Sequence, residues 1–412
     1  MEDGLIIVVG AGIGGLATAV GLHKVGFPVK VLEKSSDLRE EGASINIAVN
    51  GWRAMDALGV SDILRKQFCR IERYVAMRDS GAILKTLCID DCANGPHENR
   101  GCIRNELVKA LASALPKDTI KFGCSVETVD ISDEGCKVTL ASGETMACKV
   151  LVGADGSYSK VKAALGGPAA EYAGWASYRA MACFEDGIPN FKPDFNLMYG
   201  GQQGGIAGYY PLDTHRCYYF LGFQASQEEA DELKKANQEG KKADLARRVK
   251  NFPKHLKEAV AGTPQDEIFI NHIGDRVVEP GETWGRKLST LIGDAAHPTT
   301  PALGQGGCMA LEDGVELAAA LRDAAQTAAV PWAQVPAADI ERTLRDFERR
   351  RSTRCAPLVA EARENGRRIT ARHSWLGLFM RDFFIKRYTM EPASQFKHTL
   401  WYPASLEMPV EA

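Results

Sequence analysis

Short apolar runs that end at a glycine occur at three separate places in the chain. Residues 5–10 read LIIVVG, residues 148–156 read CKVLVGADG and residues 288–297 read LSTLIGDAAH. Continuous apolar runs of this kind, rich in β-branched residues, are typical of strands buried on both faces of a parallel sheet. The carboxyl ends of such strands lie at one edge of the sheet, where open α/β proteins bind their ligands. The pattern predicts an α/β fold with a ligand at that edge.

A helix is expected directly after the first run. Residues 11–26, AGIGGLATAVGLHKVG, have helical spacing and stop at a glycine. Residues 28–34, PVKVLEK, have the pattern of a second strand. A strand, a helix and a second strand within about 30 residues form a compact βαβ unit. This part of the sequence therefore predicts one such unit.

Apolar and polar residues alternate at 70–90 and 171–275, which predicts a second kind of sheet. Within it, YYPLDTHRCYYFLGF at 209–223 has the pattern of a hairpin. We expect a mostly antiparallel, substrate-binding sheet that is inserted twice into a discontinuous nucleotide-binding domain. The expected boundaries are 1–70, 100–170 and 276–330 for the nucleotide-binding domain, and 71–99 and 171–275 for the inserted domain.

The last part of the chain has a helical pattern. Helix is expected from about residue 308 onward, and residues 331–412 are expected to form a helical C-terminal region. The charge-rich segment IERTLRDFERRRSTR, residues 340–354, predicts a helix with a solvated surface.

Composition narrows the classes of partner. The chain has 412 residues and a net charge of -3 without a basic stripe, so no nucleic acid is expected as a partner. Its 11 cysteines are scattered and form no Cys-x-x-Cys pair, which favours a reducing compartment. No run of about 18 apolar residues is present, so no transmembrane span is expected. The opening MEDGLIIVVG is unlike a signal or transit peptide. We expect a cytoplasmic protein, or a plastid protein whose transit peptide has been removed.

The glycine cluster GAGIGG at 10–15 lies between the first predicted strand and its helix. Glycines there permit a tight turn and let a pyrophosphate approach the helix N-terminus, whose N–H groups and dipole favour negative charge. A carboxylate at the end of the second strand is placed to hold a ribose hydroxyl. This pattern does not distinguish NAD from FAD. The expected cofactor-binding residues of this unit are Gly10, Gly12, Ile13, Gly14, Gly15, Glu33 and Lys34.

Two further motifs give the chain a family resemblance. Residues 153–162 read GADGSYSKVK, and residues 293–313 read GDAAHPTTPALGQGGCMALED. Together with the glycine cluster, and in this order, they resemble the single-component FAD-dependent monooxygenases, also called flavoprotein aromatic hydroxylases. The stretch GQGGCMALED is most similar to plant-type monooxygenases related to zeaxanthin epoxidase. The resemblance covers residues 1 to about 330 and implies a Rossmann-like FAD-binding domain of the GR2 type.

The resemblance implies additional cofactor contacts. It places Asp155 and Gly156 near the FAD pyrophosphate and gives them a part in NAD(P)H binding. Lys162 stands where the family usually has arginine, which keeps the charge but loses the bidentate fork. Arg104, in RNEL at 104–107, stands where the family has an arginine that reaches the FAD.

The last motif is expected to form one wall of the flavin site. The resemblance assigns Asp294 to the ribityl hydroxyls of FAD, because a carboxylate can accept hydrogen bonds from a polyol. Pro298 and Pro301 should stiffen the loop. We expect the following helix to start near Cys308, where the family often has asparagine. The backbone should pass beside the flavin ring at Gly304, Gly306 and Gly307.

His297 in this motif has three interpretations: a metal ligand, a general base or a residue that packs the loop. A metal needs further ligands at suitable spacing, and the eight histidines are dispersed, so we expect no metal site. Hydroxylation of an activated substrate needs no base from the protein. We expect His297 to pack the loop against the flavin.

The resemblance also implies an activity. NAD(P)H reduces the FAD, O2 adds to give a flavin hydroperoxide, and one oxygen atom passes to a small aromatic or unsaturated ring. We expect the catalytic centre to include Arg179, Tyr209, Pro301 and Gly304, with Arg179 holding a carboxylate or phenolate. The wider expected lining, between the flavin and the antiparallel sheet, is Tyr178, Arg179, Tyr199, Tyr209, Tyr210, Tyr219 and Pro301.

Two other functions stay open at this point: an isoprenoid or carotenoid epoxidase, and a flavin-binding regulator without turnover. Residues 375–388, WLGLFMRDFFIKRY, are apolar with basic residues toward their end. They fit either a weak contact with a membrane surface or a helix packed across the domain interface. A monomer and a homodimer fit the sequence equally.

Overall fold

The first sheet holds all three glycine-terminated strands side by side. The computed structural model describes residues 4–38, 44–401, 403 and 406. Its five-stranded sheet is parallel throughout and has the order β17-β11-β1-β2-β7. The predicted common edge at the carboxyl ends of three apolar strands is therefore confirmed. The strands are β1 (Ile6–Val9), β2 (Val29–Leu32), β7 (Ile120–Lys121), β11 (Val150–Gly153) and β17 (Ser289–Leu291).

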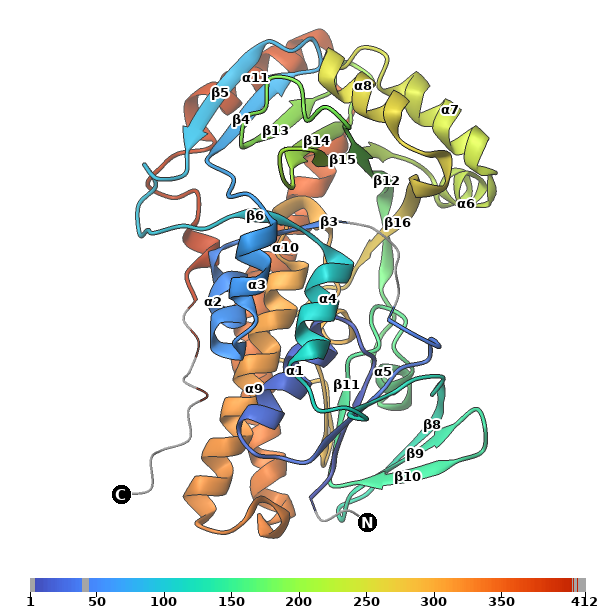
Figure 1. The fold of residues 1–412 in the computed structure, drawn as a ribbon, viewed down its shortest axis with the longest axis vertical. Helices are drawn as coiled ribbons and strands as arrows, with labels where there is room; N and C mark the ends of the chain where they lie inside the picture. The colour runs from blue at the N-terminus through green and yellow to red at the C-terminus, as the bar shows by residue number, and fades with distance from the viewer. Residues whose placement is uncertain (1–3, 39–43, 402, 404–405, 407–412) are drawn as a thin grey trace.

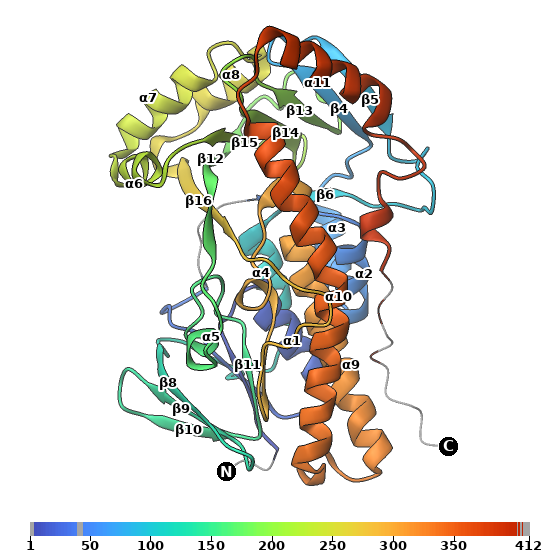
Figure 2. The same ribbon diagram turned by 180° about the vertical axis from the view of Figure 1, so that it is seen from behind.

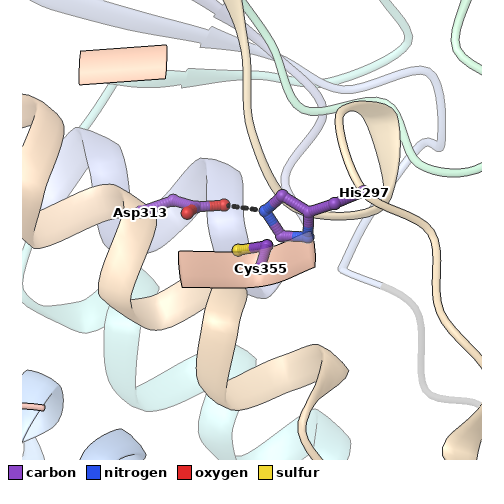
Figure 3. A group of neighbouring side chains, drawn as sticks. All are labelled: His297, Asp313 and Cys355. Carbon is purple, nitrogen blue, oxygen red and sulfur yellow. Dashed lines mark hydrogen bonds and ion pairs between the residues drawn. The ribbon is translucent and has the colours of Figure 1, made fainter. Parts of the chain in front are cut away.

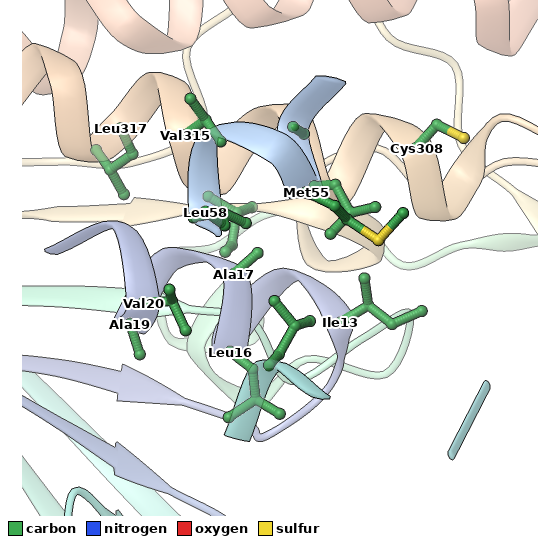
Figure 4. Close-up of a cluster of buried hydrophobic side chains, with 14 of the residues drawn as sticks. Ile13, Leu16, Ala17, Ala19, Val20, Met55, Leu58, Cys308, Val315 and Leu317 are labelled. Carbon is green, nitrogen blue, oxygen red and sulfur yellow. The ribbon is translucent and has the colours of Figure 1, made fainter. Parts of the chain in front are cut away.

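Three helices pack against one another, and the first of them lies against this sheet. They are α1 (Ile13–Lys24), α2 (Val49–Leu58) and α9 (Gly306–Ala328). Figure 4 shows their buried apolar side chains meeting in one cluster, with Leu16, Met55 and Val315 among them. A Cβ on Gly314 would lie 2.6 Å from the backbone nitrogen of Thr18, so α1 and α9 can approach this closely only because residue 314 is glycine.

The second sheet has seven strands in the order β16-β12-β15-β14-β13-β4-β5. Neighbouring strands are antiparallel except β13 and β4, which are parallel. The predicted hairpin is confirmed, because β14 and β15 pair with Tyr209 opposite Tyr219. The strands are β4 (Arg73–Arg78), β5 (Ile83–Cys88), β12 (Glu171–Cys183), β13 (Asp194–Tyr199), β14 (Ile206–Pro211), β15 (Arg216–Gln224) and β16 (Phe269–Asp275).

Helices cover one face of the seven-stranded sheet. They are α6 (Gln227–Lys235), α7 (Gln238–Arg248) and α8 (Lys254–Gly262), and their apolar side chains form a separate core with that face. The expectation of mostly sheet across 171–275 was therefore wrong for 227–262. The other face belongs to the large core that includes the parallel sheet. Figure 1 shows the seven-stranded sheet toward one end of the molecule's long axis and the parallel sheet toward the other.

The remaining strands and helices connect these two parts. The strands are β3 (Ser44–Ile47), β6 (Arg100–Ile103), β8 (Val126–Ile131), β9 (Cys136–Leu140) and β10 (Thr145–Cys148). The helices are α3 (Ser61–Gln67), α4 (Arg104–Ser113), α5 (Lys160–Ala164), α10 (Ala337–Thr370) and α11 (Trp375–Tyr388). Figures 1 and 2 show α10 running beside α9 and reaching the seven-stranded sheet.

The helix of the last motif begins at Gly306, in agreement with the expected start near Cys308. Another helix prediction needs correction. The charge-rich segment at 340–354 lies in α10, but it isn't simply a solvated surface. Phe347, Glu348 and Arg351 of this segment are buried. The two charged residues can be buried because each has an ionic or hydrogen-bonding partner inside the protein.

Candidate active site

The glycine turn after β1 is constrained by the neighbouring strand. Gly10 has a φ of +105°, and a Cβ there would lie 2.6 Å from the carbonyl oxygen of Ala154. A Cβ on Gly15 would lie 1.9 Å from the carbonyl oxygen of Gly10. Both positions exclude any larger side chain. These two glycines hold the start of α1 tightly against the ends of β1 and β11.

Space remains in front of α1. A Cβ on Gly12, the N-cap residue, would meet nothing nearer than Nη2 of Arg104, at 4.0 Å. The first N–H groups of a helix have no partners within that helix. The positive end of the helix dipole and the Arg104 guanidinium therefore favour an anion in the space between Gly12 and Arg104, which we call the cradle. Ile13 is buried, and Gly14 faces Ala310 of α9, so these two residues pack the helix.

Glu33 follows β2 and turns back toward the glycine turn. Its Oε2 accepts a hydrogen bond from the Ala11 N–H at 2.8 Å, and its Oε1 accepts one from the Ser35 N–H at 2.9 Å. The carboxylate is thus oriented by backbone donors beside the cradle. A carboxylate oxygen can accept more than one hydrogen bond, so a sugar hydroxyl is a chemically suitable donor to it. Lys34 next to it is exposed.

The loop after β11 contributes a backbone turn and a buried lysine. The Asp155 carboxylate accepts hydrogen bonds from the Ser159 hydroxyl and the Lys160 N–H, so it caps the start of α5. Gly156 has a φ of +83°, and a Cβ there would meet nothing within 4 Å. Lys162 is buried and donates to the Ser157 carbonyl at 3.4 Å. Burial and the nearby Arg276 lower the pKa of Lys162.

Asp294 follows β17 and has an accessible carboxylate. The residue is exposed, while Gly293 and Ala295 on either side of it are buried. Desolvation by the surrounding protein nevertheless raises the pKa of Asp294, and His297, Arg104 and Lys162 partly oppose that shift. The carboxylate is therefore accessible at a surface where its charged form is partly desolvated. Its oxygens can accept hydrogen bonds from a ligand held there.

His297 lies on the opposite side of the same loop. Its Nε2 is 2.7 Å from Oδ2 of Asp313 in α9, and both side chains are fully buried (Figure 3). Burial lowers the pKa of His297, but the interactions with Cys355 and Asp313 outweigh burial, and the pKa is raised well above its usual range. The same Asp313 oxygen accepts the Gly293 N–H at 2.7 Å. His297 therefore packs the loop against α9 and α10, away from the face that carries Asp294.

Sequence reasoning missed the polar network behind this loop. Arg351 of α10 donates through Nε to Asp313 at 2.7 Å and through Nη2 to Glu312 at 2.7 Å. Asn50 of α2 donates to Glu312 at 2.7 Å and to Gln305, the residue before α9, at 2.9 Å. All five side chains are buried. The only sequence signal was the ionic run at 340–354, which does not reveal partners on another helix.

Two more contacts fix the loop from behind. Arg276 donates to the Ala296 carbonyl at 2.6 Å, and the Thr300 hydroxyl donates to the Ala362 carbonyl at 2.8 Å. The loop is thus fastened to α9, α10 and the end of β16, while Asp294 stays accessible. This arrangement sets the loop's shape before any ligand binds.

His297, Asp313 and Cys355 also form a group that resembles a metal site in its geometry. One ligand atom of each lies within 4.8 Å of the others. The sequence spacing did not show this group, because its members come from a loop and two helices. Arg351 donates to Oδ1 of Asp313, and Oδ2, the oxygen next to His297, already accepts the Gly293 N–H. These contacts describe an ion-pair network, and a guanidinium beside the group repels a cation.

The glycine-rich end of the loop leads into α9. Pro301 is exposed, and Gly304 has a φ of +63° with nothing within 4 Å of a Cβ. A Cβ on Gly306 would lie 3.3 Å from Thr299, and one on Gly307 would lie 2.2 Å from the Ile45 side chain. Open space is therefore found at Pro301 and Gly304.

Cys308, the first residue after the glycines, is fully buried against α2. Its Sγ would lie 3.0 Å from a Cβ on Gly51, and burial raises its pKa to about 12. A larger side chain at either position would push the two helices apart.

Three of the tyrosines expected around the substrate lie on the wrong face of the seven-stranded sheet. Tyr178 donates to Asp244 of α7 at 3.0 Å, Tyr219 donates to Thr263 at 2.8 Å, and Tyr209 packs edge-on against His255 of α8. All three belong to the core beneath α6–α8. The expectation of Tyr209 at the catalytic centre was therefore wrong. Alternation shows which residues share a face, but not which face meets the ligand.

The opposite face carries Arg179, Tyr199 and Tyr210. Arg179 donates through Nη2 to Asn271 at 2.5 Å, and its buried Nε has no hydrogen-bond partner among the described residues. Tyr210 is buried against β3, where its hydroxyl lies 3.2 Å from the Ser44 hydroxyl. Tyr199 lies beneath Arg381 of α11. Arg179 is half-buried and keeps an unpartnered donor, Nε, which is itself buried.

Comparison with known proteins agrees with this arrangement. A family model described as an FAD binding domain matches residues 4–338. Monooxygenase 2 of Arabidopsis thaliana is 34% identical over 394 residues, which cover 93% of this chain and 94% of that protein. 3-hydroxybenzoate 6-hydroxylase of Klebsiella oxytoca is 29% identical, covering 82% of this chain and 85% of that protein. A solved structure of an HpxO variant of Klebsiella pneumoniae, complexed with FAD, has a TM-score of 0.80 and 25% identity, covering 93% of this chain and 95% of that one.

Proposed function

Because this chain belongs to the FAD-binding domain family and is an FAD-dependent monooxygenase, we propose that it uses NAD(P)H and O2 to insert one oxygen atom into a small aromatic or unsaturated ring. The observation that supports this most strongly is the loop at 293–307. It presents Asp294 to the ligand side and is fastened from behind by His297 and Arg351. The hydroxybenzoate hydroxylase among the relatives acts on an aromatic ring.

The residues at the edge of the parallel sheet fit FAD. The cradle between Gly12 and Arg104 suits the pyrophosphate, Glu33 suits the adenosine ribose, and Asp294 suits the ribityl chain. The open space at Pro301 and Gly304 suits the edge of the flavin ring. Bound FAD supplies the chemistry that takes reducing equivalents from NAD(P)H and transfers one oxygen atom from O2. The polypeptide's task is to hold FAD and substrate in register and to limit water.

Substrate binding is assigned to the face of the seven-stranded sheet that carries Arg179. Burial raises the pKa of Tyr218 to about 12, and the positive charge of Arg179 opposes this shift, so the two side chains lie close together. Phe220, paired with Arg179 across β15 and β12, adds an aromatic surface. A guanidinium beside aromatic rings binds a planar ring that carries a carboxylate, a phenolate or another anionic oxygen.

Epoxidation of an isoprenoid or carotenoid ring is the second candidate, and one observation favours it. Helix α11 exposes many apolar side chains, as a protein that takes up a lipophilic substrate can do. A regulator without turnover has no such support, because the relatives are named as monooxygenases and hydroxylases.

Anaerobic stopped-flow reduction of the bound flavin tests the proposal. NADH and NADPH are each mixed with the FAD-loaded protein alone and with hydroxybenzoates, urate and an isoprenoid ring compound. We expect one ring class to accelerate reduction at least tenfold. Arg179→Gln should weaken the effect of anionic ligands, while Arg342→Gln, an exposed arginine on α10, should leave it unchanged. Negligible reduction by both nucleotides with every ligand would contradict the proposal.

A further inference from the structure

Helix α11 buries one charged residue and exposes most of its large apolar residues. Asp382 and Ile385 are buried, and Leu378 is half-buried. The exposed side chains are Trp375, Leu376, Phe379, Met380, Phe383, Phe384 and Tyr388, with exposed fractions from 43% to 73%. This is the reverse of an ordinary surface helix, whose apolar stripe faces the core.

Polar contacts hold α11 in this orientation. Asp382 accepts hydrogen bonds from Arg78 of β4 at 2.5 Å and from Arg381 at 2.8 Å. Arg381 also donates to the Gly200 carbonyl at 2.6 Å, and its guanidinium lies over the ring of Tyr199. Because these contacts attach the helix through its charged side, the aromatic side is fixed outward.

The apolar exposure is concentrated in this one helix. Thirteen large hydrophobic residues of the described chain are exposed, and seven of them lie within the 14 residues of α11. Ile83 of β5, the edge strand on which α11 packs, is also 63% exposed. Scattered exposed apolar residues are ordinary, but a contiguous set of this kind marks an interaction surface.

The surroundings of the helix are positively charged although the chain has a net charge of -3. Six basic residues and one acidic residue lie between 367 and 388, and the acidic residue is the buried Asp382. Arg372, Lys386 and Arg387 are exposed. Arg372 also lines a cavity of about 730 Å³ with Arg247, Arg248 and Lys250, where Asp79 and Glu229 are the acidic members.

The helix is suited to lie on a membrane and is too short to cross one. A span needs about 20 residues, and α11 has 14. Over the described chain, no helix combines the length and apolarity needed to cross a membrane. Aromatic side chains with basic residues beside them favour the interface of an anionic bilayer, where the rings enter the headgroup region and the cations meet lipid charge.

We propose that the outward face of α11 docks this protein on an anionic membrane surface. Figures 1 and 2 show α11 at the end of the molecule that carries the seven-stranded sheet, with its outer side away from both sheets. The proposal is independent of which ring compound the enzyme oxidises.

Vesicle flotation of the FAD-loaded protein tests the proposal. Wild-type protein is mixed with vesicles of phosphatidylcholine alone, or of phosphatidylcholine with about 30% phosphatidylglycerol, which gives the negative surface of a natural anionic membrane. We expect flotation with the anionic vesicles, little with the neutral ones, and a marked loss of binding at high salt. The double variant Phe379→Ser with Phe383→Ser should reduce the bound fraction at least fivefold, and Lys386→Glu with Arg387→Glu should do the same.

Ile63→Ser with Phe122→Ser is the matched control, because it removes exposed apolar side chains from other parts of the surface. This control should float like wild type. Flavin absorbance and melting temperature check that each variant is folded. We expect both to match the wild type, because the substituted side chains are exposed. No flotation of the wild type, or equal losses in the control, would overturn the proposal. A dimer seen by light scattering would also overturn the proposal if the double variant Phe379→Ser with Phe383→Ser dissociated it and neither protein bound vesicles. A second copy of the chain would then cover the helix.

Discussion

Asp294 and Asp313 belong to the same sequence motif but have opposite environments. Asp294 is exposed, and desolvation raises its pKa. Asp313 is fully buried, yet its pKa is lowered, because His297, Arg351 and the Gly293 N–H outweigh the desolvation that raises it. An unpaired buried carboxylate is unfavourable, whereas a fully paired one can be retained as a structural tie. One aspartate is thus available to a ligand, and the other fixes the loop.

The ion pair of His297 and Asp313 predicts how stability depends on pH. Since the pKa of His297 is raised above 6.5 in the folded protein, its contribution is complete below pH 6.5 and is lost as the pH rises through the raised value. His297→Gln should reduce the free energy of unfolding at pH 6 by about 3–5 kcal/mol, as expected when one partner of a buried pair is removed. The variant should also flatten the decline above pH 6.5. Urea unfolding between pH 6 and 9 measures both effects.

His215→Gln provides the control, because His215 is exposed. Its unfolding curves should follow those of the wild type at every pH. A His297→Gln variant with wild-type stability at pH 6 would show that the pair does not fasten the loop.

The contact between α1 and α9 depends on residues without side chains. Gly314→Val would force atoms against the backbone of Thr18, and Ala17 lies at similar distance. We expect a loss of at least about 1–3 kcal/mol of stability, the usual effect of overpacking a core. Gly262→Ala at the end of α8 is the control, since a Cβ there meets nothing within 4 Å. Denaturation of the two variants compares them directly, and equal stabilities would refute the close packing of the helices.

The elements nearest the cofactor were predictable because local pattern determines them. LIIVVG and its glycines predicted β1, the turn and α1, and the strands β11 and β17 followed from the same pattern. The helices at 227–262 and the orientation of Tyr178 and Tyr209 toward the core beneath α6–α8 were missed. Whether a strand's odd or even residues face the ligand depends on the layers stacked against it, which no local window contains.

The network behind the loop was also beyond prediction from sequence. Arg351 lies in a run of arginines whose other members are exposed or half-buried, and nothing local distinguishes it. Its partners lie on α9, which packs beside α10 only in the folded protein. The motif at 293–313 predicted Asp294 as a ligand-facing residue, but not the residues that hold it there.

Helix α10 joins the two halves of the molecule. Arg351 pairs with Asp313 behind the loop at 293–307, and the Ala362 carbonyl accepts a hydrogen bond from Thr300 of that loop. Further along the same helix, Arg363 pairs with the buried Asp275 at the end of β16. The relative position of the loop and the seven-stranded sheet is therefore set by one rigid element. Such an arrangement can keep a bound cofactor and a bound substrate in register.

The proposed cofactor site is assembled from four distant segments of the chain. Gly12 follows β1, Arg104 begins α4, Lys162 lies in α5 and Asp294 follows β17. A Cβ built on Gly12 would lie 4.0 Å from Nη2 of Arg104, and the positive charges of Arg104 and Lys162 oppose the rise in the pKa of Asp294. If FAD is gripped at this junction, removing the accessible carboxylate must weaken FAD binding while the fold is retained.

Titration of apoprotein with FAD, followed by flavin fluorescence, measures this directly. Asp294→Ala should bind FAD at least about tenfold more weakly than wild type, because a hydrogen bond to a charged group contributes about 1.5–3 kcal/mol. Asp294→Asn should be intermediate, and Asp186→Ala, at an exposed position, should bind like wild type. FAD affinity of Asp294→Ala within twofold of the wild-type value would contradict the placement of the flavin against the loop at 293–307.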